Sequence, residues 1–228
     1  MDLNKIKEIL DKEPGFRLKQ IKQAVFDELI GNWAQATTLS LDLRQKLESI
    51  SPIYELTVEK ELTSKDGETT KVLLSAQDGS KIEAVLMRHG STDLPLTGRS
   101  TVCISSQVGC SLGCQFCATG QLGFKRNLSD WEMVEQVLFF AKILKKEQKR
   151  VDNVVFMGMG EPFLNYDNVL SAVKIINDQN GLNLGARHIS ISTCGVVEGI
   201  KRFTDEDLQV NLAISLHASN NALRSKLV

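Results

Sequence analysis

Four of the five cysteines of the chain fall within fifteen residues, in the stretch CISSQVGCSLGCQFCATG. Three of them, Cys110, Cys114 and Cys117, have the spacing C-x3-C-x2-C. A structural zinc site would need a fourth ligand, and the three histidines lie far away in the sequence. An iron–sulfur cluster on three thiolates keeps one iron open, as a catalytic metal site requires. A buried trio of unreactive thiols is the third interpretation, although the intervening SLG and QF show no apolar period.

The composition is that of an ordinary folded protein, and it limits the classes of partner. Hydrophobic residues make up 42% of the 228 residues, and 27 basic residues stand against 28 acidic ones. These values exclude a disordered or fibrous chain. The net charge of −1 gives no overall attraction to nucleic acids or anionic membranes, so any such contact needs a local basic patch.

The sequence predicts a cytoplasmic protein without a membrane segment. It starts with MDLNKIKEIL, which lacks the basic region and the long apolar core of a signal peptide. No apolar run approaches the roughly 18 residues that a membrane span needs. In a reducing compartment, clustered cysteines are metal ligands or catalysts more often than structural disulfides.

The elements before the cysteines divide into a helical part and a strand-rich part. Residues 1–50 follow a helical period, and Ser40 is a candidate N-cap for the segment SLDLRQKLESI. The apolar stripe of this helical part consists of Leu18, Ile21, Val25 and Leu29. Three strands are then predicted at YELTVEKEL, TKVLLSA and KIEAVLM, joined by Asp-Gly turns. The looser segment RHGSTDLPLTGRS reads as a linker.

From Thr101 onward, strands and helices alternate. Strands are predicted at TVCISSQ, NVVFMG, HISIST and LQVNLAISL, and helices at LSDWEMVEQVLFFAKILKKEQKR, NYDNVLSAVKIINDQNG (closing on Gly181), VVEGIKRFT and NNALRSKLV. The inward face of the long helix consists of Val134, Val137, Leu138, Ala141 and Leu144. Four βα units in a row predict a parallel sheet or barrel, whose functional site lies at the carboxyl ends of the strands.

These motifs together resemble one enzyme family. CSLGCQFC is the cysteine signature of the radical S-adenosylmethionine (SAM) enzymes. The longer run TVCISSQVGCSLGCQFCATGQLGFKRNL, with MGMGEPFLNYDNV, ISTCGVV and LAISLHA after it, resembles the RlmN group. That group contains the dual-specificity 23S rRNA and tRNA adenine-C2 methyltransferases, and the resemblance extends from Phe16 to Val228.

The resemblance implies an α/β fold, a radical SAM partial (βα)6 barrel, here with about four βα units. The barrel would occupy residues 99–228, after a β-hairpin extension with a linker (51–98) and a helical accessory domain that helps to bind RNA (1–50). A 4Fe-4S cluster on Cys110, Cys114 and Cys117 would bind the amino and carboxylate groups of SAM through its free iron.

Further SAM contacts are implied at the ends of three predicted strands. Gly160 and Glu161 would bind the amino end, and the remaining contacts, to the ribose and carboxylate, would come from Ser192, Ser215, Leu216 and His217. The residues themselves agree: the glycines of MGMGEP permit close backbone approach, and Pro162 favours an extended Glu161. Read alone, Glu161 would be an ordinary acidic residue at a helix start and His217 a core histidine.

Two more residues match the family's pattern. Glu83 lies where the family has a glutamate that accepts a proton, and Cys103 where it has a redox-active cysteine. Without the resemblance, Glu83 would be an exposed strand residue and Cys103 a buried strand cysteine. Cys194 occupies a position where the family has a small hydroxyl residue, and we interpret it as a packing residue.

The implied reaction uses two SAM molecules. One methylates a cysteine of the enzyme, and the other is cleaved to a 5′-deoxyadenosyl radical that activates this methyl group for addition to C2 of adenine. Glu83 would be the base, and Cys103 would release the product through a disulfide with the methyl-carrying cysteine. An electron donor such as flavodoxin or ferredoxin is implied, and we expect a monomer. In the family the methyl-carrying cysteine lies after SLHA, so we expect it beyond Val228 and expect the last strands of the barrel there too.

Basic residues offer only local candidates for RNA contacts. Lys125 and Arg126 follow the cysteine loop and are the candidates for contacts with phosphates. A lysine face of the long helix, interpreted as a solvated surface, consists of Lys142, Lys145, Lys146 and Lys149. Two other functions stay open: an adenine-C8 rRNA methyltransferase of the antibiotic-resistance type, and an inactive iron–sulfur or zinc RNA-binding fragment. The motifs GEP and Val108 favour the C2 enzyme.

Overall fold

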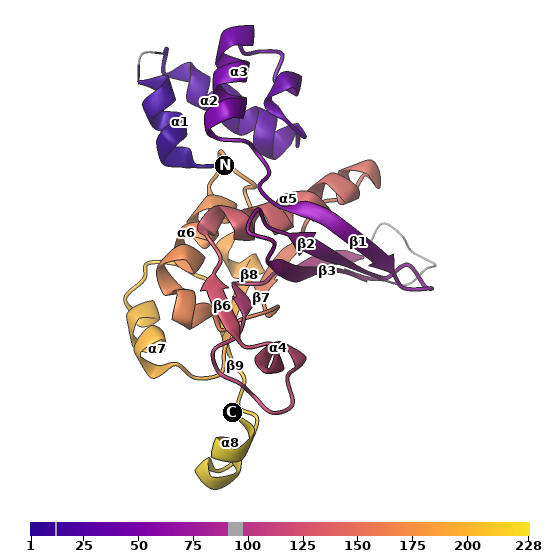
Figure 1. Cartoon of the computed structure of the whole chain (residues 1–228), viewed down its shortest axis with the longest axis vertical. Coiled ribbons are helices and arrows are strands. Elements are labelled where there is room, and N and C mark those ends of the chain that lie inside the picture. Colours follow the sequence, from indigo (N-terminus) through magenta and orange to yellow (C-terminus); the bar gives the residue numbers. More distant parts are fainter. Residues whose placement is uncertain (12, 91–97) are drawn as a thin grey trace.

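The fold is known from a computed structural model that describes residues 1–11, 13–90 and 98–228. Figure 1 shows a group of short helices at one end of the molecule, a twisted sheet in the middle and the C-terminal helix at the opposite end. The predicted linker RHGSTDLPLTGRS includes residues 91–97, which lie outside the described residues.

The N-terminal helical region forms around one apolar stripe. It comprises α1 (Leu3–Leu10), α2 (Phe16–Lys22), the π-helical turn η1 (Gln23–Asp27), the 3-10 turn η2 (Trp33–Gln35) and α3 (Leu41–Ile50). Ile21, Val25 and Leu29 of the predicted stripe are buried, and Leu18 packs against them half-buried. Ser40 caps α3 as predicted, because its Oγ accepts a hydrogen bond from the Leu43 backbone N–H at 3.4 Å.

One seven-stranded sheet joins the predicted hairpins to the predicted βα units. Its strands, in spatial order, are β1 (Thr57–Thr63), β2 (Thr69–Ser75), β3 (Lys81–His89), β4 (Arg99–Cys103), β7 (Asn153–Phe156), β8 (Ile189–Thr193) and β9 (Asn211–Ile214). The pairs from β1 to β4 are antiparallel, and those from β4 to β9 are parallel. The strand-rich segment therefore extends the same sheet to which the βα units belong.

Helices follow the parallel strands, as the alternation predicted. They are α5 (Asp130–Lys146), α6 (Tyr166–Asn177), α7 (Val197–Thr204) and α8 (Asn221–Leu227), with short turns α4 (Ala118–Gln121), η3 (Pro162–Asn165) and η4 (Ala186–His188). All five predicted inward residues of α5 are buried, and Ser129 and Glu132 form a capping box at its start. Helix α6 ends before Gly181, because the Asp178 backbone C=O and side chain accept hydrogen bonds from Gly181 and Asn180 and so form a turn.

The two faces of the parallel part of the sheet differ in character. Val102, Val154 and Ile189 are fully buried on the face that the helices cover. On the opposite face, the register aligns half-buried side chains of Cys103, Val155 and Ser190. Residues two apart on a strand share a face, so Ser192 also lies on this second face. The open face is therefore the one that carries the predicted functional side chains.

A second, two-stranded sheet was not predicted from the sequence. It pairs β5 (Gln107–Gly109) with β6 (Phe124–Asn127), and the cysteine loop lies between these two strands. The predicted strand TVCISSQ is accordingly split, since β4 ends at Cys103 and β5 begins at Gln107. None of the helices among the described residues has the length and apolar character needed to cross a bilayer.

A buried carboxylate holds the segment that leaves the helical region against α5. The Glu135 side chain accepts hydrogen bonds from the backbone N–H groups of Glu55 and Leu56 at 2.9–3.0 Å, and the Met1 ammonium lies 3.9 Å away. Burial raises the pKa of Glu135 to about 7, although these donors oppose the shift. The carboxyl group is thus held in a place that favours its protonated form.

This arrangement predicts that the free energy of unfolding decreases between pH 4.5 and 7. Over that range the folded protein keeps the Glu135 proton that the unfolded chain has released, and the difference corresponds to roughly 3 kcal/mol. Glu135→Gln should flatten or reverse this dependence. Thermal unfolding of both proteins from pH 4.5 to 8 measures it, with Glu61→Gln, at an exposed position on β1, as the control. Parallel curves for wild type and Glu135→Gln would contradict the assignment.

Candidate cluster and cofactor site

The three spaced cysteines lie on the loop between β5 and β6, beside the carboxyl ends of the parallel strands. The backbone N–H of Cys110 donates to the Gly123 carbonyl at 3.1 Å, and that of Cys117 to the Cys114 carbonyl at 3.0 Å. At Gly120 a Cβ atom would lie 2.9 Å from the Cys114 backbone nitrogen, so only glycine allows the loop to fold back this closely. The loop is therefore a compact turn that carries its three cysteines between β5 and β6.

The donor set fits a 4Fe-4S cluster. All five cysteines are free thiols and are half-buried. Burial raises the pKa of Cys110, and the charges of Cys114, Cys117 and Glu161 raise it further, so these groups lie within electrostatic reach of one another. Within the described ranges no group of three or more His, Cys, Asp or Glu side chains could hold a metal ion. A cluster makes a different demand, because each thiolate binds its own iron rather than sharing one ion.

Glu161 is a buried carboxylate in the turn that follows β7. Its side chain is 4% exposed; one oxygen accepts from the Phe163 N–H at 3.0 Å and the other from the Cys194 N–H at 2.9 Å. The residue is extended (φ −100°, ψ 113°), as predicted from the following proline. Two fixed backbone donors thus set the direction of the carboxylate, while its remaining lone pairs can accept from an ammonium group.

Gly160 permits the backbone before Glu161 to approach Gln107. It has φ +97°, and a Cβ there would lie 2.5 Å from the Gln107 Cβ. The Gln107 Oε1 accepts from the Glu161 N–H at 2.9 Å, and its Nε2 donates to Asn127 at 2.8 Å. The glycine predicted for close approach to a ligand therefore meets a protein side chain, and Gln107 connects β5 and β6 to the Glu161 turn.

Cys194 and Arg224 belong to the same hydrogen-bonded group, and neither was predicted to have a role there. The Cys194 N–H binds Glu161, and its carbonyl accepts from the Arg224 guanidinium. Burial, with the Glu161 carboxylate, raises the pKa of Cys194 to about 12. In addition, the Leu227 carbonyl accepts from the Gln115 N–H of the cysteine loop at 2.9 Å. Helix α8 thus connects the cysteine loop to the loop after β8, a pairing that no sequence period indicates.

The residues predicted on the last two strands come together. The hydroxyl oxygens of Ser192 and Ser215 are 3.1 Å apart, and the Ser215 N–H donates to the Thr193 carbonyl. Leu216 is exposed, and His217 has φ +61° with its ring 4.7 Å from that of Phe116 in the cysteine loop. His217 is therefore an exposed residue at the cysteine loop and not a core histidine.

Glu83 and Cys103 share one face of the sheet. Val85 pairs directly with Cys103, so Glu83 is a diagonal neighbour of that cysteine across β3 and β4. The Glu83 carboxylate is 46% exposed and accepts from the Lys71 Nζ at 2.9 Å. Burial raises the pKa of Cys103, which favours the thiol. The two residues face the open side of the sheet together with Ser192.

The two basic candidates after the cysteine loop are held by acidic partners. Arg126 makes a bidentate ion pair with Glu132 at 2.7–2.8 Å and a further contact with Asp78 at 2.9 Å. Lys125 lies 3.7 Å from the same Asp78 carboxylate and is 56% exposed. Lys125 remains accessible to a phosphate, whereas most of the Arg126 guanidinium is occupied.

Comparison with known proteins gives a consistent result. Residues 104–227 match the family model of the radical SAM superfamily. The whole chain is 46% identical to a probable dual-specificity RNA methyltransferase RlmN of Dictyoglomus thermophilum and covers 63% of that protein. Over 73% of its length it is 53% identical to a ribosomal RNA large subunit methyltransferase N of Nitrosopumilus maritimus, of which it covers 48%.

A solved structure is similar as well. The crystal structure of a radical SAM methyltransferase from Sphaerobacter thermophilus superposes with a TM-score of 0.92 at 43% identity, over all of this chain and 65% of that one. The chain thus spans slightly less than two thirds of the Dictyoglomus and Sphaerobacter proteins.

Proposed function

Because the chain belongs to the radical SAM superfamily, we propose that it is part of an enzyme that methylates C2 of adenine in 23S rRNA and in tRNA. The observation that carries the proposal is the convergence of the cysteine loop, Glu161 and the Ser192–Ser215 pair at one end of the sheet. Similarity to proteins named RlmN along the full chain supports the choice of RNA and of C2.

Three thiolates, on Cys110, Cys114 and Cys117, would hold the cluster and keep one iron for SAM. When bound, the cluster would supply the electron that cleaves SAM to a 5′-deoxyadenosyl radical. An external donor such as flavodoxin or ferredoxin and a cytoplasmic location fit this requirement.

The protein's own residues would position SAM and move protons. Glu161, fixed by two backbone N–H donors, would accept from the SAM ammonium group, which is supported by its burial and its fixed direction. The backbone of Gly160 would lie beside the same ammonium end of SAM. Ser192 and Ser215 would donate to the ribose and carboxylate, with Leu216 and His217 at the rim of the site. RNA bound over the open face of the sheet would exclude water from the site.

Glu83 and Cys103 would act on the adenine. Glu83 would accept the proton released from C2, after leaving its Lys71 partner. Cys103 would form a disulfide with the methyl-carrying cysteine and so release the product. The shared sheet face of Glu83 and Cys103 supports these roles. Lys125 would contact phosphate beside the loop.

The test is a methylation assay with a 23S rRNA fragment and a tRNA transcript, SAM and a low-potential reductant. Because the Dictyoglomus relative is longer than this chain, the assay uses the complete gene product. Nucleoside mass spectrometry with chromatography separates 2-methyladenosine from 8-methyladenosine. We expect only the 2-methyl product, and a loss of at least about tenfold in turnover for Cys103→Ala. Formation of 8-methyladenosine alone, or of no methylated adenosine, would contradict the proposal.

A further inference from the structure

A cavity lies at the opposite end of the parallel strands from the cysteine loop. It has a volume of about 440 Å³ and lies between the helical region, α5 and the segment that leads into β8. Its floor is apolar, formed by Phe26, Leu29, Val137, Ala141, Leu182 and Leu184. Asp152 and His188 at its edge directly precede β7 and β8, whereas Glu161 and Ser192 lie at or after the other ends of these strands. The cavity is therefore separate from the candidate cluster site.

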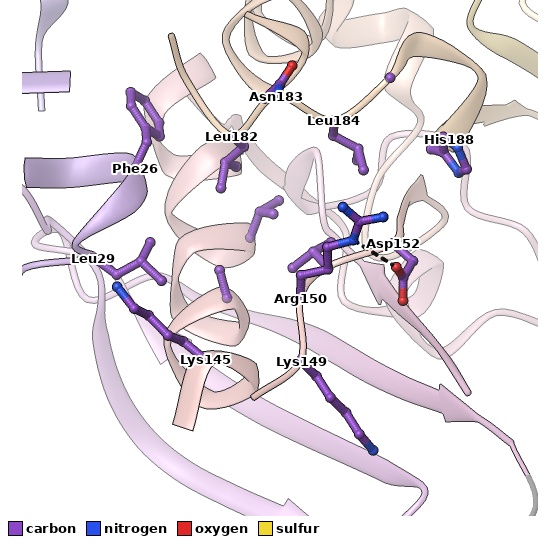
Figure 2. A pocket seen from close by; sticks show the side chains of 14 residues that line it. Phe26, Leu29, Lys145, Lys149, Arg150, Asp152, Leu182, Asn183, Leu184 and His188 are labelled. Atoms are coloured by element: carbon purple, nitrogen blue, oxygen red, sulfur yellow. Dashed lines mark hydrogen bonds and ion pairs between the residues drawn. The ribbon is translucent and has the colours of Figure 1, made fainter. Parts of the chain in front are cut away.

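The rim of this cavity is positively charged, and we name it the cationic cavity. Lys145, Lys149 and Arg150 line it with a single acidic residue, Asp152, in a chain whose net charge is −1. Figure 2 shows the Arg150 guanidinium between Leu184 and Asp152, with Lys145 and Lys149 on the side of α5. The end of α5 and the residues after it thus bring an excess of positive charge to an opening whose apolar lining comes from three segments distant in the sequence.

Two of these cations are available to a ligand. The Arg150 side chain is 88% exposed, and its only contact among the described residues is with Asp152, at 3.4 Å. The Asp152 carboxylate also accepts from the Ser100 N–H at 2.8 Å. The Lys149 ammonium has no polar partner in the part of the chain that the structure describes, whereas the Lys145 ammonium donates to the carbonyls of Asp27 and Glu28. The Lys149 charge is therefore unneutralised, and Arg150, with one long ion pair on an 88% exposed side chain, stays accessible at the edge of the apolar hollow.

We propose that the cationic cavity is a second contact surface for the RNA substrate, in which Lys149 and Arg150 bind backbone phosphates. This inference rests on the proposed function. Positive charge beside an apolar floor is complementary to RNA, whose phosphates are anionic and whose sugars and bases offer apolar faces. Asp78 and Glu132 occupy the guanidinium of Arg126, which the sequence predicted as a phosphate contact. Lys149 and Arg150 are therefore more available to phosphates than Arg126.

The position of the cationic cavity determines what this contact can do. Strand β8 begins at the cationic cavity and carries Ser192 near its other end. Its five residues span about 16 Å. A phosphate bound there belongs to a part of the RNA remote from the reacting adenine. Such contacts orient and hold the RNA and add salt-dependent affinity, but they do not touch the reacting atoms. We therefore expect an effect on RNA affinity and none on the rate with saturating RNA.

The test compares two matched double charge reversals. The first is Lys149→Glu with Arg150→Glu. The control is Lys60→Glu with Lys65→Glu on the β1–β2 hairpin, where both lysines are exposed and have no ion pair among the described contacts. The probe is a fluorescently labelled, unmodified tRNA transcript, and its affinity is measured by anisotropy from 50 to 200 mM salt. Circular dichroism and thermal unfolding check that each variant is folded.

We expect the cavity variant to bind tRNA at least about tenfold more weakly near 0.1 M salt. The slope of log K against log salt should fall by roughly 1.4–1.8, for two lost phosphate contacts on an RNA with paired and unpaired parts. The neutral pair Lys149→Gln with Arg150→Gln should reduce the slope similarly. If the cavity variant binds like the hairpin control, this inference is wrong and the proposed function is untouched. If wild type shows no salt-dependent tRNA binding, the proposed function itself fails.

Discussion

Replacing Cys110, Cys114 or Cys117 by alanine is expected to abolish the iron–sulfur cluster. Wild-type protein reconstituted without oxygen should contain about four irons and four sulfides per chain, with broad visible absorbance. Each single variant removes one of only three protein ligands, and the loop between β5 and β6 has no fourth cysteine to replace it. We expect less than about one tenth of the wild-type iron in each variant.

The two remaining cysteines are matched controls. Cys103 lies on β4 and Cys194 after β8, and alanine at either position should leave the iron content at the wild-type level. The triad thiols are half-buried, so their loss should change the unfolding temperature of the cluster-free protein little. Iron, sulfide and zinc analysis of all five variants is the measurement. A cluster retained without a triad cysteine, or lost with Cys103, would refute the ligand assignment.

Arg126→Glu is expected to destabilise the fold by about 3–5 kcal/mol. Arg126 makes two charge-assisted hydrogen bonds to Glu132, whose side chain is only 8% exposed and also accepts from the Ser129 N–H at the start of α5. The Glu132 partner raises the pKa of Arg126 and Asp78 raises it further, so the guanidinium is firmly charged. Reversal would place a third carboxylate beside those of Asp78 and the nearly buried Glu132.

Lys125→Glu is the neighbouring control for this prediction. Its side chain is exposed and 3.7 Å from Asp78, so we expect a change within about 1 kcal/mol. Urea unfolding of both cluster-free variants gives the comparison. Equal stabilities would show that the Arg126–Glu132 pair is unimportant for folding. The same comparison matters for RNA binding, because any loss of affinity in Arg126→Glu has to be corrected for unfolded protein.

The fold class was predictable because local periods and family motifs agree. The alternation of apolar strands with amphipathic helices predicted the parallel sheet, and the similarity to the Sphaerobacter structure confirms the radical SAM methyltransferase fold. Helix starts can also be predicted from local sequence. Ser40 and Ser129 cap α3 and α5, because each side chain accepts a hydrogen bond from a backbone N–H in the first turn of its helix. The placement of Glu161, Ser192 and Ser215 at or after the ends of β7, β8 and β9 followed from the same alternation.

Pairings between distant segments could not be predicted in this way. Strands β5 and β6 are short and the whole cysteine loop separates them, so neither has a clear period. Gln107 and Cys194 reach Glu161 from 54 and 33 residues away, and nothing in their local sequence indicates that partner. The same holds for Arg126, whose partners became visible only once β6, the β2–β3 turn and α5 were placed together.

Electron paramagnetic resonance of the reduced cluster, with and without SAM, tests the central claim most directly. The claim is that three cysteines hold a cluster with one iron free for SAM, beside Glu161. The account predicts a reduced 4Fe-4S signal whose g-values shift when SAM is added, and a Glu161→Gln variant that needs about tenfold more SAM for the same shift. A signal that saturating SAM leaves unchanged, or reconstituted protein with no iron–sulfur signal, would contradict it.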